Sequence, residues 1–519
     1  MAANTSQGDP RQVDDTIPMT QSQKTVFEFG DFDHSAIPLE KEEWPVIIIG
    51  SSMVGMTLGV LLGYHGIKSV SFDRHPSTAI HPRAALFLLR SVEIFRQLGL
   101  EDHLRENSAL NFDLDAGMLI VEKLVGGKVI ASLQESDPAR VAEVTPSNRL
   151  WLTQNMFEPL LRASAQGSGA TQEFKQAVVH YEEGDDGVLV VVQDLETGAY
   201  RKFKTQYLVA CDGNRSATRA KEGIAWGGPG VVGENISINF KADLISHLGT
   251  RAKHGVTRFP PDSVTGADAK RYFRDATGIE DDVGLEVESI SYWSVAGLNS
   301  ERFESRKDAH NLAWKLAYVL SGKAAPSLLR TYSSERQPVA FQTMQQAYYR
   351  LQTRVFRQQP DEPELPDLTC EIGYRYPLGA LVVSEEESED ASCIWEDPHA
   401  PLVLAGSRFP HVEITDSGDA SRRISTLDLV KTQFLVVVAD EASPWVEAAK
   451  ISPLGIDCYS LHATSTPYRD AEGKVRRVCK LGEGEALLVR PDGFIAWRAG
   501  KRESGHEAVL QQVLREILG

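Results

Sequence analysis

A glycine-type turn and a single acid are the residues of this chain best suited to chemistry. Gly50, Ser52 and Gly55 occupy the three positions of a Gly-x-Gly-x-x-Gly turn, and Asp73 follows 23 positions after the first. Such a turn points backbone N–H groups and a helix N-terminus at one spot, which suits a pyrophosphate. An acid about 20 residues later can accept hydrogen bonds from ribose hydroxyls. The four residues predict a bound dinucleotide.

The elements around the turn support this prediction. Residues 46–49 are an apolar run of strand length, residues 53 onward have helical composition, and a second strand at 68–72 ends at the acid. Ser52 replaces the usual middle glycine, so its side chain takes room but adds a hydroxyl donor. The alternative is a turn that only lets a helix pack closely on a strand. The strand, the helix and the placed acid together favour the dinucleotide.

Two further places could contribute to the same edge. An apolar strand runs into Asp212 and Gly213 within YLVACDGNRSATR at 207–219, which puts a carboxylate at a strand's carboxyl end, where open parallel sheets bind ligands. A plain Asp-Gly turn remains the alternative there. Arg83 precedes a helix predicted from Leu88, Val92 and later apolar residues, and a solvated surface arginine is equally consistent with its position.

Composition excludes several functions. The 519 residues include 72 acids and 54 bases, a net charge of −18, which argues against nucleic acid and against an anionic membrane surface. No apolar run is long enough to span a bilayer, and the polar first 30 residues lack the core of a secretory signal, so we expect a cytoplasmic protein. Five scattered cysteines without a C-x-x-C pair predict no disulfide framework and no metal site.

Composition also predicts the domain boundaries. Residues 1–43 read as a mobile polar tail, 44–345 as the dinucleotide-binding part, and 346–369, with Pro360, Pro363 and Pro366, as a linker. Residues 370–519 have strands and helices of their own and form a second α/β region.

Several motifs together resemble the flavoprotein aromatic hydroxylases, the single-component FAD-dependent monooxygenases related to para-hydroxybenzoate and phenol hydroxylases. The chain looks most similar to their polyketide-tailoring members, and the resemblance covers about residues 44–500. The motifs are IIIGSSMVG with Asp73, HPRA at 81–84, LTQNMFEPLL at 152–161, YLVACDGNRSATR at 207–219, DAHNLAWKLA at 308–317, TYSSERQPVA at 331–340, GSRFPHVEI at 406–414 and ALLVRPDGFIAWR at 486–498.

The resemblance implies an α/β fold with a Rossmann-like FAD-binding domain, an interleaved β-sheet substrate domain at about 110–135 and 225–300, and a C-terminal thioredoxin-like domain. Lacking C-x-x-C, that last domain would be structural or serve homodimer contacts. The resemblance further implies that Gly50, Ser52 and Gly55 hold the FAD pyrophosphate, Asp73 the ribose, Arg74 lies beside adenine, Arg83 faces the flavin or the nicotinamide, Gln154 contacts the adenosine side, and Asp212 with Gly213 helps both dinucleotides bind.

The function implied by the resemblance is hydroxylation of an electron-rich phenolic, polyketide-like ring, with NADPH or NADH reducing FAD and O₂ supplying the oxygen. No metal is needed. No catalytic base can be assigned from the sequence. His81 and His310 qualify by position only, and a helix-end or packing role is favoured for each.

One departure from the family pattern is serious. In the family a Gly-Asp motif with a proline- and glycine-rich loop precedes the DAHNLAWK-type helix, and its aspartate reaches the flavin ribityl chain. Here SYWSVAGLNSERFESRK at 291–307 runs directly into Asp308. The chain is therefore either a divergent or inactive FAD-fold relative, which would bind a partner or small molecule, or the product of a gene model that lost coding sequence. Baeyer–Villiger oxygenation on the same scaffold is a further alternative.

Overall fold

The computed structural model describes most of the chain, in two compact units. The described residues are 19–20, 29–30, 32–80, 85–112, 118–133, 137–248, 266–280, 283–302, 309–360, 362–384, 393–419, 421–461, 467–470, 472–501 and 504–519. Within these ranges, no helix combines the length and the apolar character that a membrane crossing requires.

The larger unit contains a six-stranded sheet in the order β8-β3-β2-β11-β10-β9. β2 is buried on both faces, which explains its unbroken apolar run: Val46 and Ile48 face the helices, while Ile47 and Ile49 face the cluster of β9, β10 and β11. The first four strands are parallel; β10 runs antiparallel to β11, and β9 runs antiparallel to β10. The strands are β2 (Trp44–Ile49), β3 (Ser69–Asp73), β8 (Ala170–Phe174), β9 (Gln176–Gly184), β10 (Gly187–Asp194) and β11 (Tyr200–Ala210).

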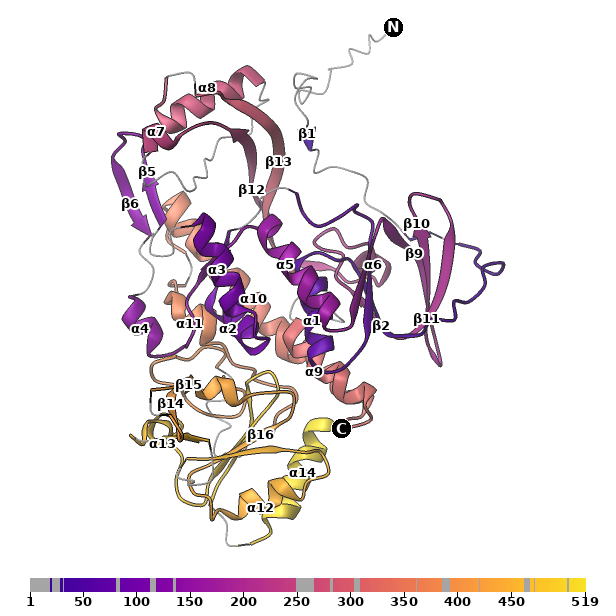
Figure 1. The fold of residues 1–519 in the computed structure, drawn as a ribbon, viewed down its shortest axis with the longest axis vertical. Helices are drawn as coiled ribbons and strands as arrows, with labels where there is room; N and C mark the ends of the chain where they lie inside the picture. The colour runs from indigo at the N-terminus through magenta and orange to yellow at the C-terminus, as the bar shows by residue number, and fades with distance from the viewer. Residues whose placement is uncertain are drawn as a thin grey trace. The chain divides into compact units, whose positions relative to one another are not determined.

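Helices α1 (Met53–Tyr64), α5 (Gln154–Gly167) and α9 (Ala309–Leu320) cover one face of this sheet (Figure 1). Buried Leu58, Leu61 and Leu62 of α1 pack on β2 and α9. The remaining elements of this region are the two-stranded pair β4 (Leu86–Phe87) and β7 (Leu150–Trp151), and the helices α2 (Leu89–Gln97), α3 (Glu101–Asn111), α4 (Pro138–Ala142), α6 (Ala217–Lys221), η2 (Pro326–Arg330), α10 (Thr331–Leu351), η3 (Gln352–Phe356) and α11 (Asp367–Ile372). Helical structure thus extends to residue 356, inside the predicted linker.

The C-terminal region of the same unit has a four-stranded sheet in the order β17-β16-β19-β20. One apolar cluster joins this sheet to α12 and α14, and another fills its opposite face. The sheet strands are β16 (Leu435–Val438), β17 (Asp457–Ser460), β19 (Ala486–Val489) and β20 (Ile495–Ala499); around them lie β14 (Glu413–Asp416), β15 (Arg423–Ser425), β18 (Tyr468–Arg469), η5 (Thr426–Leu429), α12 (Pro444–Lys450), α13 (Lys474–Val478) and α14 (His506–Leu518).

The smaller unit combines β1 with parts of residues 109–135 and 226–299, the ranges in which the inserted substrate domain is expected. Its sheet has the order β1-β13-β12, and Ala269 of its helix α8 packs on Ile236 and Ile290. Its elements are β1 (Met19–Thr20), the hairpin of β5 (Met118–Val121) and β6 (Val129–Leu133), β12 (Trp226–Lys241), α7 (Ile245–Leu248), α8 (Gly266–Thr277) and β13 (Glu286–Ser300).

Part of the predicted N-terminal tail is attached to the larger sheet. Leu39 forms a parallel bridge with Lys202 of β11, and the N–H of Glu40 donates to the carbonyl oxygen of Lys202 at 2.8 Å. Phe29 stacks edge-to-face on Tyr181 of β9, with ring centroids 5.0 Å apart. These backbone and aromatic contacts hold residues 29–43, where described, against strands β9 and β11. The sequence had predicted a mobile tail there.

Candidate dinucleotide-binding site

The two glycines of the turn are required by close packing. Gly50 has φ 98°, and a Cβ there would lie 2.7 Å from the carbonyl oxygen of Cys211. A Cβ on Gly55 would lie 2.0 Å from the carbonyl oxygen of Gly50. A side chain at position 50 would therefore push the turn away from the end of β11. A side chain at position 55 would push α1 away from the turn. Close packing does not exclude ligand binding by the turn, because the packing of α1 on the sheet sets the direction in which the backbone N–H groups of the turn point.

The N-terminus of α1 offers open donors. Ser52 is its N-cap, with extended backbone and no side-chain capping hydrogen bond. Ser52 and Val54 are exposed, and among the described residues their backbone N–H groups have no acceptor. The start of a 12-residue helix carries partial positive charge. Exposed amide groups at this positively charged helix end fit a phosphate.

A buried carboxylate that sequence reasoning did not single out supports the turn. Glu158 of α5 is 1% exposed. Its Oε1 accepts from Ser52 Oγ at 2.7 Å and from the Met53 N–H at 3.1 Å, and its Oε2 accepts from the Ala79 N–H at 2.6 Å. Gln154, one helical turn earlier, donates from Nε2 to Ser52 Oγ at 3.0 Å and to Glu158 Oε1 at 2.7 Å. Gln154 therefore reaches the turn through Ser52, and Glu158 fixes the start of α1.

Asp73 lies at the turn, as its spacing predicts. The residue is 8% exposed; Oδ2 accepts from the Ser51 N–H at 2.6 Å, and Oδ1 accepts from the His75 N–H at 2.8 Å. Each carboxylate oxygen has two lone pairs, so both can accept a second hydrogen bond from a hydroxyl. Arg74, the next residue, is exposed, and no described hydrogen bond links it to the turn.

The second predicted turn is adjacent to the first. The N–H of Cys211 donates to the carbonyl oxygen of Ile49 at 2.8 Å, so β11 ends beside β2. Asp212 Oδ2 accepts from Ser216 Oγ at 2.7 Å and from the Thr218 N–H at 3.1 Å, which anchors the start of α6. Gly213 is exposed with φ 82°. The structure thus brings together Gly50, Ser52, Gly55, Asp73, Gln154, Asp212 and Gly213.

The remaining candidates from the sequence are not part of this described site. Arg83 and His81 lie outside the described residues, as does the segment 303–308 that leads into α9. His310 is 4% exposed, and its Nε2 lies 2.7 Å from Gln97 Oε1. This contact holds the imidazole between α9 and α2, in the packing role that the sequence favours.

Comparison with known families supports the geometry. Residues 43–279 and 293–347 match the family described as "FAD binding domain", and residues 403–519 match "Aromatic-ring hydroxylase, C-terminal". Together these matches include the turn, the acid and the second sheet.

Known relatives match nearly the whole chain. A 4-methyl-5-nitrocatechol 5-monooxygenase from Burkholderia sp is 33% identical over 92% of this chain and 98% of its own length. A tetracenomycin B2 monooxygenase-dioxygenase from Streptomyces olivaceus is 29% identical over 92% of this chain and 99% of its own.

The fold has a close match among solved structures. Aklavinone-11 hydroxylase, solved with FAD and aklavinone, superposes with a TM-score of 0.83 at 25% identity over 92% of this chain and all of that one. Fold, turn geometry and full-length similarity agree. The chain belongs to the FAD-binding aromatic-ring hydroxylase family of flavoprotein monooxygenases.

Proposed function

We propose that this protein hydroxylates a phenolic, polyketide-like ring, using FAD, O₂ and either NADPH or NADH. The observation that carries the proposal is the sheet edge at Gly50, with the exposed amides of Ser52 and Val54 beside Asp73. The names of the relatives support the substrate class, because they act on a nitrocatechol, on tetracenomycin B2 and on aklavinone.

The residues present fit FAD. The amides of Ser52 and Val54 would donate to the pyrophosphate, Asp73 would accept from the adenosine ribose, and Gln154 would orient the Ser52 hydroxyl. Arg74 would lie beside adenine, and Arg83 would face the flavin or the nicotinamide. Asp212 and Gly213 would border the cofactor where β11 ends. When bound, FAD supplies the redox chemistry with O₂.

The C-terminal region is proposed to be a thioredoxin-like domain with a structural role or a role in homodimer contacts. Its sheet order β17-β16-β19-β20 supports this, since the first pair is parallel and the other two are antiparallel. Burial raises the thiol pKa of Cys458 to about 11 and that of Cys479 to about 12, so these two cysteines are poor nucleophiles.

The test is spectroscopic and then chemical. Purified protein titrated with FAD should develop a flavin band that bleaches with NADPH or NADH in the absence of O₂. With a catechol or hydroxyanthraquinone as substrate, the product should gain one oxygen atom and keep its ring; an expanded or opened ring would indicate Baeyer–Villiger chemistry instead. A protein that binds flavin but is not reduced by either nicotinamide would contradict the proposal.

A second candidate function, binding without oxygenation, is favoured by an open strand edge. β10 pairs with β11 only through Tyr200–Thr205, while β2 pairs with residues 205–210 on the other side. Within the described chain no strand pairs with residues 206–210 on the β10 side. The alignment with the nitrocatechol monooxygenase runs over 541 residues, more than the 519 of this chain, so that relative has segments without a counterpart here.

The open edge lies in the sheet that α9 covers, and the Gly-Asp segment of the family would directly precede α9. We infer that a further strand, absent among the described residues, belongs beside residues 206–210 of β11. A folded, colourless protein with no flavin band would support the binding function. The Gly-Asp segment can be absent from this chain for two reasons, and genomic and transcript sequence around codon 306 distinguishes them. An in-frame Gly-Asp coding stretch there would mean that the gene model lost coding sequence, and its absence would mean true divergence.

A further inference from the structure

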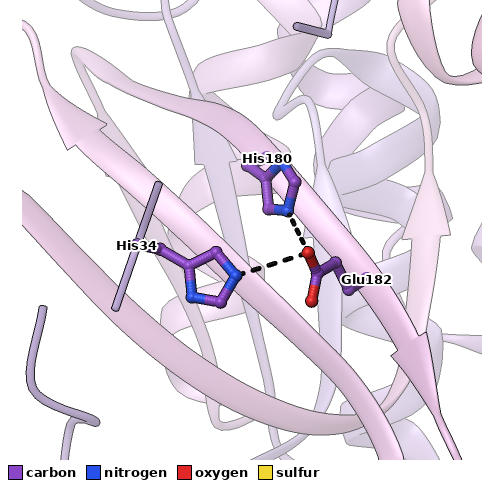
Figure 2. A group of neighbouring side chains, drawn as sticks. All are labelled: His34, His180 and Glu182. Carbon is purple, nitrogen blue, oxygen red and sulfur yellow. Dashed lines mark hydrogen bonds and ion pairs between the residues drawn. The ribbon is translucent and has the colours of Figure 1, made fainter. Parts of the chain in front are cut away.

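Two histidines and a glutamate converge on one point of the first sheet, away from the turn. His180 and Glu182 are two positions apart on β9, so both side chains lie on the same face of the strand. His34 comes from the N-terminal segment, far away in the sequence. Figure 2 shows both imidazole rings directed at the same carboxylate oxygen. The sequence predicted no metal site because only the fold brings these residues together.

The distances match a shared metal ion. Glu182 Oε1 lies 3.0 Å from His180 Nε2 and 3.4 Å from His34 Nε2. One ligand atom from each of the three residues lies within 4.8 Å of the others. In a tetrahedral zinc site with bonds of about 2.0–2.1 Å, neighbouring ligand atoms are about 3.3 Å apart. A Zn²⁺ ion would therefore need little side-chain rearrangement.

The ligand atoms themselves favour a cation at this point. A neutral imidazole protonated on Nδ1 presents a lone pair at Nε2. Three lone-pair-bearing atoms then face one another, which is unfavourable unless protons or a cation lie between them. Zinc prefers two imidazole nitrogens with a carboxylate over the oxygen-only sets of Ca²⁺ and Mg²⁺.

The surroundings hold the ligands but leave one side open. The side chains of His180 and His34 are 10% and 20% exposed, while Glu182 is 56% exposed, so a water molecule could complete the coordination. The backbone of His34 is fixed, because its carbonyl oxygen accepts from Lys202 Nζ at 3.0 Å and from the Ile37 N–H at 3.1 Å. The Lys202 charge opposes a cation, and the ionised Glu182 offsets it.

We propose that His34, His180 and Glu182 bind a Zn²⁺ ion that fastens the segment around residue 34 to β9. The match to the FAD-binding family begins at residue 43, so it includes His180 and Glu182 but not His34, and the complete set of three ligands is not part of that match. The site is independent of flavin chemistry. Its role is structural, because binding to the folded state alone stabilises that state by mass action.

The experiment uses full-length protein stripped with a chelator and titrated with Zn²⁺ alone by calorimetry. We expect about one ion bound per chain, and a loss of affinity of about tenfold or more in His180→Asn and in Glu182→Gln. His34→Asn should behave alike and should also abolish zinc protection of the N-terminal segment against limited proteolysis. His103→Asn, which changes an exposed histidine of α3, should bind zinc like the parent.

Circular dichroism without zinc separates misfolding from loss of a ligand, because all four variants should retain the parent spectrum. Equal zinc affinity in His103→Asn, His180→Asn and His34→Asn would overturn the proposal. So would the absence of stoichiometric binding to the folded parent.

Discussion

Two of the three Asp-Gly dipeptides in the chain have nearly the same backbone and opposite chemistry. Gly213 and Gly493 have φ values of 82° and 79°. Gly213 is exposed at the edge of the first sheet, and the neighbouring Asp212 anchors α6 through neutral hydroxyl and amide donors. Asp492 is 1% exposed and pairs with Arg490 Nη2 at 2.5 Å. The dipeptide fixes the turn, but the surrounding charges decide what the turn does.

The buried turn belongs to a charge network that joins three parts of the larger unit. Arg490 Nη2 also lies 2.8 Å from Glu335 of α10, and Lys315 Nζ of α9 lies 2.8 Å from the same carboxylate, all fully buried. Asn311 donates to both acids. In this network the polar groups bond to one another. At the sheet edge near Gly50, the exposed backbone N–H groups of Ser52 and Val54 have no acceptor among the described residues. A region that stabilises the fold pairs its polar groups internally, and a region that binds a ligand leaves some of them open.

Removing the central cation should have the largest effect. Arg490→Met removes the cation that bridges the buried carboxylates of Glu335 and Asp492, so we expect a loss of about 3–5 kcal/mol in the free energy of unfolding. Urea unfolding followed by circular dichroism measures it. Arg215→Met, beside the exposed turn, should change stability by less than about 0.5 kcal/mol. Similar losses in both variants would remove the distinction between the turns.

The second largest expected effect is a loss of stability in acid at the buried turn of Asp492. Burial raises the pKa of Asp492, but the charge and hydrogen bond of Arg490 outweigh it and lower the pKa to about 2. Because the folded-state value lies below the unfolded one, this stabilisation is present above about pH 4 and is lost as the pH falls toward 2. The contribution is about 2 kcal/mol. Unfolding free energies from pH 5 to pH 2 should fall less steeply in Asp492→Asn than in the parent, and parallel slopes would contradict this assignment.

The smallest expected effect is on FAD affinity, which should differ between alanine variants of the two turns. A Cβ on Gly213 meets nothing within 4 Å and one on Gly493 meets only Arg90 Nη2 at 3.8 Å, so alanine at either position costs mainly backbone strain, about 1–2 kcal/mol. FAD affinity, measured by quenching of flavin fluorescence, should fall only in Gly213→Ala. A matching fall in Gly493→Ala would show that the affinity change reports stability and not contact.

The sequence predicted the first turn because its information is local: a strand, two glycines and an acid within one β-α-β unit. The helix expected in the DAHNLAWKLA motif is also present, as α9. Glu158 was quoted within a motif but not given a role, because its contacts with Ser52 and Ala79 depend on the packing of α5 against α1. The partners of Glu335 were missed for the same reason.

The most direct test of the account compares two aspartates that each accept two backbone N–H bonds on the same sheet. Asp73 accepts from Ser51 and His75 at the turn, and Asp194 accepts from Glu196 and Thr197 at the end of β10. Alanine at either should lower the melting temperature of the FAD-free protein similarly. Only Asp73→Ala should weaken FAD binding, by about tenfold or more. A folded parent that binds no FAD, or an Asp73→Ala variant with parental affinity, would contradict the assignment of this edge as the cofactor site.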